Sequence, residues 1–78
     1  MKYPDLFTEL RYKSHEILDL LIQNKISVAE IKVSELTKLL NELILISKDK
    51  GTLKVLNHYK ILMRQMKLKI ATLKNSIN

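Results

Sequence analysis

The sequence predicts an all-α protein, arranged as an antiparallel, up-down-up three-helix bundle with coiled-coil-like seams, either alone or as a dimer. Apolar residues recur at alternating steps of three and four along most of the 78-residue chain, which is the repeat of one helix face. One glycine and one proline leave few places for the chain to turn. Residues 26–33 contain enough β-branched side chains to suit a strand, but no second segment could pair with them. Helices are therefore expected throughout a single domain, residues 1–78.

The first helix is predicted at about residues 4–24. Pro4 suits a first helical turn, where its missing N–H would have no partner within the helix anyway. Leu6, Leu18 and Ile22 widen the apolar stripe into a face suited to the core of a helical bundle. The central seam of this face comprises Tyr3, Phe7, Leu10, Ser14, Ile17 and Leu21.

The second helix is predicted at about residues 28–48. Ser27 and Glu30 fit a capping box, in which the serine hydroxyl accepts from the N3 amide and the glutamate reaches back to the serine amide. At the other end, Gly51 is expected to adopt the left-handed conformation that commonly follows a helix. The predicted core positions are Leu36, Leu39, Leu40, Leu43, Ile44 and Ile46.

The third helix is predicted at about residues 52–76, with Thr52 as its N-cap. Its seam is filled without a gap by Leu56, Tyr59, Met63, Met66, Ile70, Leu73 and Ile77. Because the three helices have similar lengths and short links, neighbouring helices are expected to be antiparallel. The alternative is a long hairpin of the second and third helices that dimerises.

The charge of the chain is concentrated at one end. Residues 1–51 contain eight cations and all eight carboxylates, whereas residues 52–78 contain six cations and no carboxylate, which accounts for the whole net charge of +6. Such asymmetry indicates an anionic partner. Part of this excess positive charge could be neutralised within the chain, if Lys60, Lys67 and Lys74 pair with glutamates of the second helix. Those glutamates are Glu30, Glu35 and Glu42.

The third helix also has apolar residues outside its seam. Ile61 and Leu68 are seven residues apart and point directly away from the seam, so they could form a second docking stripe for another copy or another protein. Long lysine side chains beside a seam can cover apolar surface while their ammonium groups remain in water. The residues predicted to bind a partner are Lys60, Ile61, Arg64, Lys67, Leu68 and Lys69.

No catalytic, metal or cofactor site is expected. His15 and Asp19 share one helix face, but a catalytic zinc ion needs three protein ligands, and the only other histidine, His58, is on another helix. Ser14 is expected to donate to the carbonyl four residues back instead of acting as a nucleophile. A glycine-rich phosphate loop cannot be built with one glycine.

Cysteine is absent, so the composition excludes a disulfide-stapled secreted protein, and a cytoplasmic location is expected. The longest apolar run, residues 43–46, is far shorter than the roughly 20 residues that cross a bilayer, and no signal-peptide core is expected at the N-terminus.

Two resemblances bear on function. Leu10 and Arg11 followed by an apolar helix slightly resemble the first helix of small chorismate mutases, but Leu20, Leu21 and Lys25 come too early and no second arginine stands where that site would require one. In size, basic charge and helical content, the chain is similar to bacteriocin immunity proteins and to small phage-encoded inhibitors of host proteins.

The two apolar sides and the uncompensated charge of the third helix predict a non-catalytic protein that acts stoichiometrically as a regulator, inhibitor, chaperone or adaptor on another protein with an acidic surface. The second resemblance agrees with this prediction. The main alternative is sequence-nonspecific nucleic-acid binding by the basic third helix. That helix offers only one arginine for reading bases, and no free aromatic side chain for stacking. A membrane surface is a further, weaker alternative partner.

Overall fold

The computed structural model describes residues 6–76, which form three α-helices joined by two short links. Helix α1 spans Leu6–Ile22, α2 spans Ile26–Ile46 and α3 spans Lys50–Ser76. The all-α prediction is confirmed, and residues 6–76 contain no strand. The predicted roles of Tyr3, Pro4 and Ile77 lie outside the described residues.

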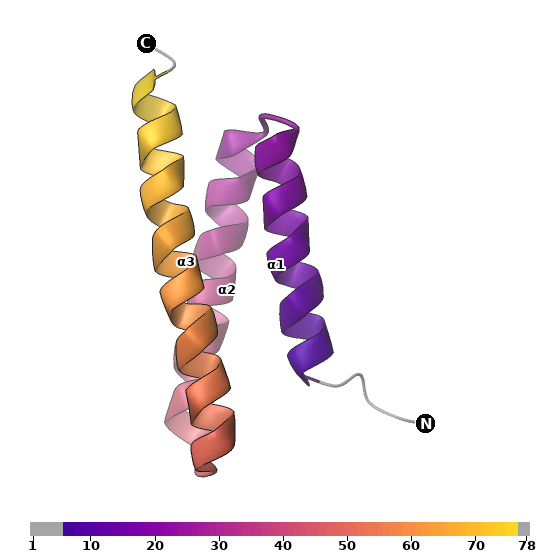
Figure 1. The fold of residues 1–78 in the computed structure, drawn as a ribbon, viewed down its shortest axis with the longest axis vertical. Coiled ribbons are helices and arrows are strands. Elements are labelled where there is room, and N and C mark those ends of the chain that lie inside the picture. Colours follow the sequence, from indigo (N-terminus) through magenta and orange to yellow (C-terminus); the bar gives the residue numbers. More distant parts are fainter. Residues whose placement is uncertain (1–5, 77–78) are drawn as a thin grey trace.

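Helix α2 is the centre of the arrangement. It packs against both α1 and α3, whereas α1 and α3 make little direct contact with each other. In Figure 1, α2 lies between and behind the two flanking helices. The molecule is correspondingly flat, with extents of 45 × 26 × 15 Å. Helix α2 covers the region between α1 and α3 on one side of the molecule, and no described helix covers it on the other side.

The core consists of one apolar stripe from each helix. The predicted seam of α3 is largely confirmed, because its central positions are buried and Tyr59 and Leu73 are half-buried against them. Burial of this stripe supplies most of the stability of such a helix. The buried apolar residues are Leu10, Ile17, Ile26, Ala29, Val33, Leu36, Leu40, Leu56, Met63, Met66 and Ile70.

Several predicted core positions are wrong. Ile22 is 82% exposed and Leu18 is 42% exposed, because α1 touches only one other helix closely and the outer part of its stripe has no neighbour. Ile46, in the last turn of α2, is exposed as well. Ser14 is buried, as its seam position implies, but its hydroxyl has no hydrogen-bond partner among the described residues, so the predicted bond to its own helix is absent.

The link between α1 and α2 is a Schellman motif built on Asn24. Asn24 has φ of 63°, its N–H donates to the carbonyl of Leu21 at 3.1 Å, and the N–H of Lys25 donates to the carbonyl of Leu20 at 2.8 Å. Asparagine tolerates this left-handed conformation better than any other residue except glycine. The motif turns the chain sharply, so that Ile26 is already buried at the first position of α2.

The predicted caps of α2 and α3 are therefore corrected. Helix α2 begins at Ile26 with Lys25 as its N-cap, and no side chain caps it, so Ser27 lies inside the first turn instead of forming a capping box. Gly51 does not terminate α2 and has no positive φ, because it lies in the first turn of α3. Thr52 is not the N-cap of α3 either.

Asp49 caps α3 instead. The backbone N–H and the hydroxyl of Thr52 both donate to Asp49 Oδ2, at 2.9 and 3.0 Å. These bonds favour the ionised carboxylate, and they lower the pKa of Asp49 below its ordinary value of 3.8, the backbone N–H having the larger effect. A carboxylate accepts a hydrogen bond from the helix terminus more strongly than a threonine hydroxyl does, which explains why the helix begins two residues earlier than predicted.

Candidate protein-binding surface

The six residues predicted to bind a partner all lie in the middle of α3, but not on one face. Each residue advances about 100° around a helix, so Ile61, Arg64 and Leu68, spaced by three and four, share a face. Lys60 and Lys67 lie beside Arg64 on the side toward α2, because these three cations line a hollow of about 190 Å³ together with Thr37. The remaining residue of the set, Lys69, lies on the other side of the helix.

We call the group that the structure brings together, Lys60, Ile61, Arg64, Lys67 and Leu68, the α3 docking surface. Its apolar members are accessible to a partner, since Ile61 is 55% exposed and Leu68 is 65% exposed. Lone exposed aliphatic side chains are common on protein surfaces. These two are stacked along one helix face, and the three cations lie beside them on the side toward α2, which gives the surface an apolar stripe with one charged border.

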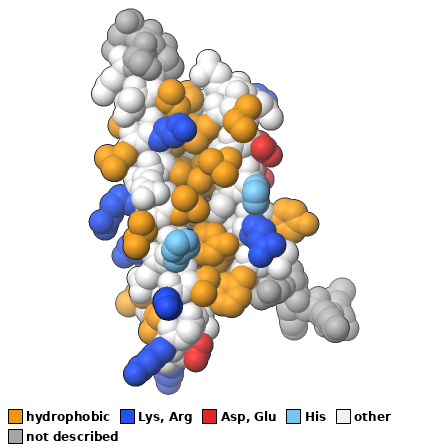
Figure 2. All heavy atoms as spheres, in the orientation of Figure 1, with side chains coloured by type: hydrophobic (Ala, Val, Ile, Leu, Met, Phe, Trp, Pro, Cys, Tyr) orange, Lys and Arg blue, Asp and Glu red, His pale blue; other side chains and the backbone are white. Residues whose placement is uncertain are grey.

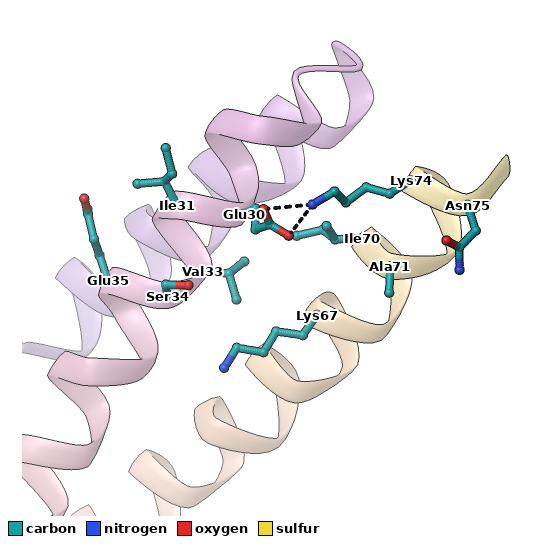
Figure 3. Close-up of a pocket in the computed structure, with 10 residues that line it drawn as sticks. All are labelled: Glu30, Ile31, Val33, Ser34, Glu35, Lys67, Ile70, Ala71, Lys74 and Asn75. Carbon is teal, nitrogen blue, oxygen red and sulfur yellow. Dashed lines mark hydrogen bonds and ion pairs between the residues drawn. The ribbon is translucent and has the colours of Figure 1, made fainter. Parts of the chain in front are cut away.

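Only one of the predicted lysine–glutamate pairs is formed. Lys74 Nζ lies 2.9 Å from Glu30 Oε2 and 3.1 Å from Glu30 Oε1, and both side chains are about half exposed. Figure 3 shows this pair across the end of the groove between α2 and α3, with the Lys67 side chain directed toward α2 but joined to no carboxylate. Exposed pairs of this kind contribute only about 0–1 kcal/mol.

The cations of the α3 docking surface are not neutralised within the described part of the chain. Among residues 6–76, no carboxylate lies within ion-pair distance of Lys60, Arg64 or Lys67. The other described ion pair joins Lys32 of α2 to Glu16 of α1, at 3.4 Å. The positive charge is therefore available to an outside partner.

A groove of about 720 Å³ between α2 and α3 continues the docking surface toward the end of α3. It contains Lys67 and the Glu30–Lys74 pair, and its apolar lining includes Ile31 and Ala71 (Figure 3). The apolar pattern of the sequence did not indicate that Ile31 and Thr37 of α2 would lie beside the docking surface. Ile31 lies outside the core positions of α2, so the sequence could predict that it is exposed. The sequence could not predict which residues of α3 lie beside it.

The described residues contain no other arrangement that points to chemistry. No group of three His, Cys, Asp or Glu side chains among them could hold a metal ion, and His15 and His58 are on different helices. None of the described helices has both the length and the apolar character needed to cross a membrane. No family model, curated protein or solved structure matches this chain. Its function must therefore be argued from its surfaces.

Proposed function

We propose that this chain is a small, non-catalytic helical protein-interaction module that binds an acidic surface of another protein through the α3 docking surface. It would act by occupying that surface, as a cytoplasmic regulator, inhibitor, chaperone or adaptor. One observation carries the proposal: Ile61 and Leu68 are exposed on one face of α3, beside three cations that have no carboxylate partner among the described residues.

The two kinds of side chain have different tasks in such a complex. Since Ile61 is 55% exposed and Leu68 is 65% exposed, covering them would contribute about 1–2 kcal/mol each. Lys60, Arg64 and Lys67 would accelerate encounter with an acidic surface and select against basic ones, while contributing less to the final affinity. Arg64 lies between the two aliphatic side chains along the helix, so it is the cation best placed to form a charge-assisted bond at the centre of the interface.

We also infer that neighbouring helices run antiparallel and that their contacts follow coiled-coil-like seams. The short links at residues 23–25 and 47–49 support this, because such links cannot return the chain to the start of the previous helix. The Glu30–Lys74 pair, which joins the first half of α2 to the last turns of α3, supports it as well.

The test of the docking surface uses the immobilised chain to capture a partner, which is then identified, purified and titrated by calorimetry. The test variant is Ile61→Ser/Leu68→Ser. Its matched control is Val28→Ser/Leu45→Ser, which removes two exposed aliphatic side chains from α2. We expect the test variant to weaken binding at least about tenfold and the control to leave it within about twofold.

Circular dichroism should show equal helicity for both variants. Equal affinity of the two variants for the purified partner would show that Ile61 and Leu68 are not the docking stripe.

Nucleic acid is the second candidate, because α3 carries seven cations and no carboxylate over its 27 residues. A fluorescent duplex DNA is the probe. If nucleic acid is the partner, its affinity falls steeply as salt is added, Lys60→Glu/Lys67→Glu abolishes binding, and Ile61→Ser/Leu68→Ser leaves it unchanged. The protein-binding proposal predicts no binding of the DNA at physiological salt.

A further inference from the structure

The groove between α2 and α3 extends well beyond the docking surface. The hollow beside Thr37 and the larger groove toward the end of α3 both include Lys67, so they form one continuous channel on the surface, which we call the α2–α3 groove. On α3 it reaches from Lys60 to Asn75, which is about 22 Å along the helix axis. The groove is therefore about four helical turns long.

Across the groove, a row of cations lies between two apolar borders. The row consists of the three cations of the docking surface, which line the hollow on the α2 side of α3. Ile61 and Leu68 form one border, on the side of the row away from α2. Ile31 of α2, which is 58% exposed, forms the other border. An occupant of the groove would meet apolar, positive and again apolar surface in that order.

Short side chains line the groove on both helices. Ser34 of α2 and Ala71 of α3 are exposed within it, and neither reaches far from its helix. The hydroxyl of Thr37 donates to the carbonyl of Val33 at 2.8 Å, so its hydrogen is already used within α2. Because the distance between packed helices depends on the side chains at the contact, short side chains allow an occupant to approach closely.

The unpaired charge of the groove is positive. Figure 2 shows Lys and Arg side chains along the length of α3. Both carboxylates that line the groove are on α2: Glu30 is held by Lys74 at 2.9 Å, and the Glu35 side chain is directed away from α3 in Figure 3. Lys67 is directed toward α2, and no carboxylate of residues 6–76 lies within ion-pair distance of it. The occupant therefore has to supply carboxylates.

The occupant must also satisfy its own backbone. Helices α2 and α3 use their N–H and C=O groups in bonds within each helix, and residues 6–76 contain no strand whose edge could accept another segment. An extended peptide in the groove would find no partners for its backbone, whereas a helix pairs its own backbone groups. A helix is thus the form of chain that this groove suits.

We propose that the α2–α3 groove binds an amphipathic helix of the partner protein, with a row of carboxylates between two apolar rows. This rests on the function proposed above and specifies the form of the partner. Lys60, Arg64 and Lys67 are spaced by four and three, so a helix that lies along α3 meets them with carboxylates three or four residues apart. A segment of about 15 residues matches the length of the groove.

A library of displayed random peptides of about 20 residues, selected against the immobilised chain, tests the form of the occupant. We expect enriched peptides to carry carboxylates three or four residues apart, with apolar residues on both sides of that row. Fluorescence anisotropy at low salt then measures the affinity of the tightest peptide. Proline in its middle should weaken binding at least about tenfold, because proline breaks a helix. Enrichment of no peptide, or binding that the proline leaves unchanged, would overturn the proposal.

The variant Ser34→Glu tests whether that peptide occupies the groove. The new carboxylate lies on α2, toward which Lys67 is directed, so it offsets that positive charge and repels an acidic helix. Its matched control, Thr8→Glu, makes the same change of charge at an exposed position of α1, away from the groove. We expect Ser34→Glu to weaken peptide binding at least about tenfold and the control to leave it within about twofold. Circular dichroism should show equal helicity for both.

Comparison with Ile61→Ser/Leu68→Ser separates this proposal from the proposed function. Peptide binding that this double variant abolishes and Ser34→Glu leaves unchanged would overturn the groove and leave the α3 docking surface in place. The reverse result would support the groove and show that Ile61 and Leu68 are not the docking stripe. A peptide whose binding neither variant changes would overturn both assignments.

Discussion

At the scale of single residues, two side chains in the links determine where the helices begin and end. Asn24 allows the left-handed turn that ends α1, and Asp49 accepts two hydrogen bonds from Thr52 at the start of α3. Neither of them lies in the apolar core. Their effect is to make both links short, so that α1 and α3 are held beside the same central helix.

Asp49 should make stability depend on acid pH. Since the pKa of Asp49 lies below its ordinary value of 3.8, its carboxylate stabilises the folded state above that pH. This stabilisation is lost as the pH falls from 3.8 through the lowered pKa. We therefore expect Asp49→Ala to reduce the urea midpoint at neutral pH, and the difference from the wild type to shrink toward zero in strong acid. Parallel pH curves for the two proteins would contradict this role.

At the scale of the element, α3 carries positively charged side chains one helical turn apart, with no carboxylate on the helix to offset their repulsion. Lys60 and Arg64 are four residues apart, and Arg64 and Lys67 are three apart, so each pair lies close together on the helix surface. Like charges at these spacings destabilise a helix by about 0.2–0.5 kcal/mol per pair. A helix selected only for stability would be expected to carry a carboxylate at one of these positions.

Arg64→Glu should therefore stabilise the protein while impairing its function. The change converts two repulsive pairs into attractive ones, so we expect the free energy of unfolding to rise by about 0.8–2 kcal/mol. Urea denaturation at low salt measures this, and high salt should reduce the gain. The same variant should bind an acidic partner more weakly than the wild type. A loss of stability on this substitution would indicate that Arg64 has a structural partner within the chain.

At the scale of the whole molecule, the stability of the fold should depend on protein concentration. Helix α2 alone supports the flanking helices, so part of the apolar stripe of α1, including Leu18 and Ile22, is not covered by another described helix. The sequence also allows a dimer, and if a second copy covers these side chains, mass action stabilises the folded chain. We expect the Tm of the wild type to rise with protein concentration, whereas that of Leu18→Lys/Ile22→Lys should be lower and independent of concentration. A concentration-independent Tm for the wild type would contradict this.

The candidate site could be predicted from the sequence only in part. Exposure of Ile61 and Leu68 followed from their positions opposite the seam, and the structure confirms it. The separation of Lys69 from Lys67 follows from helical spacing, since two residues place them about 200° apart around the axis. Only the structure shows that Lys60 and Lys67, and not Lys69, lie on the side of α3 that meets α2. The predicted pairs of Lys60 and Lys67 with glutamates failed because they required a register between helices, which periodicity along one helix does not contain.

The sequence alone determined that the protein is all-α, that three helices form, and that Leu56, Met63, Met66 and Ile70 are buried, because these features depend on the repeat of apolar residues within one segment. Only the tertiary structure decided which stripes are covered on both sides. Leu18 and Ile22 have the spacing of core residues, yet they are exposed, because burial requires a neighbouring helix and α1 has only one. The exposure of these side chains therefore follows from the way the helices pack, which the pattern within any one helix does not specify.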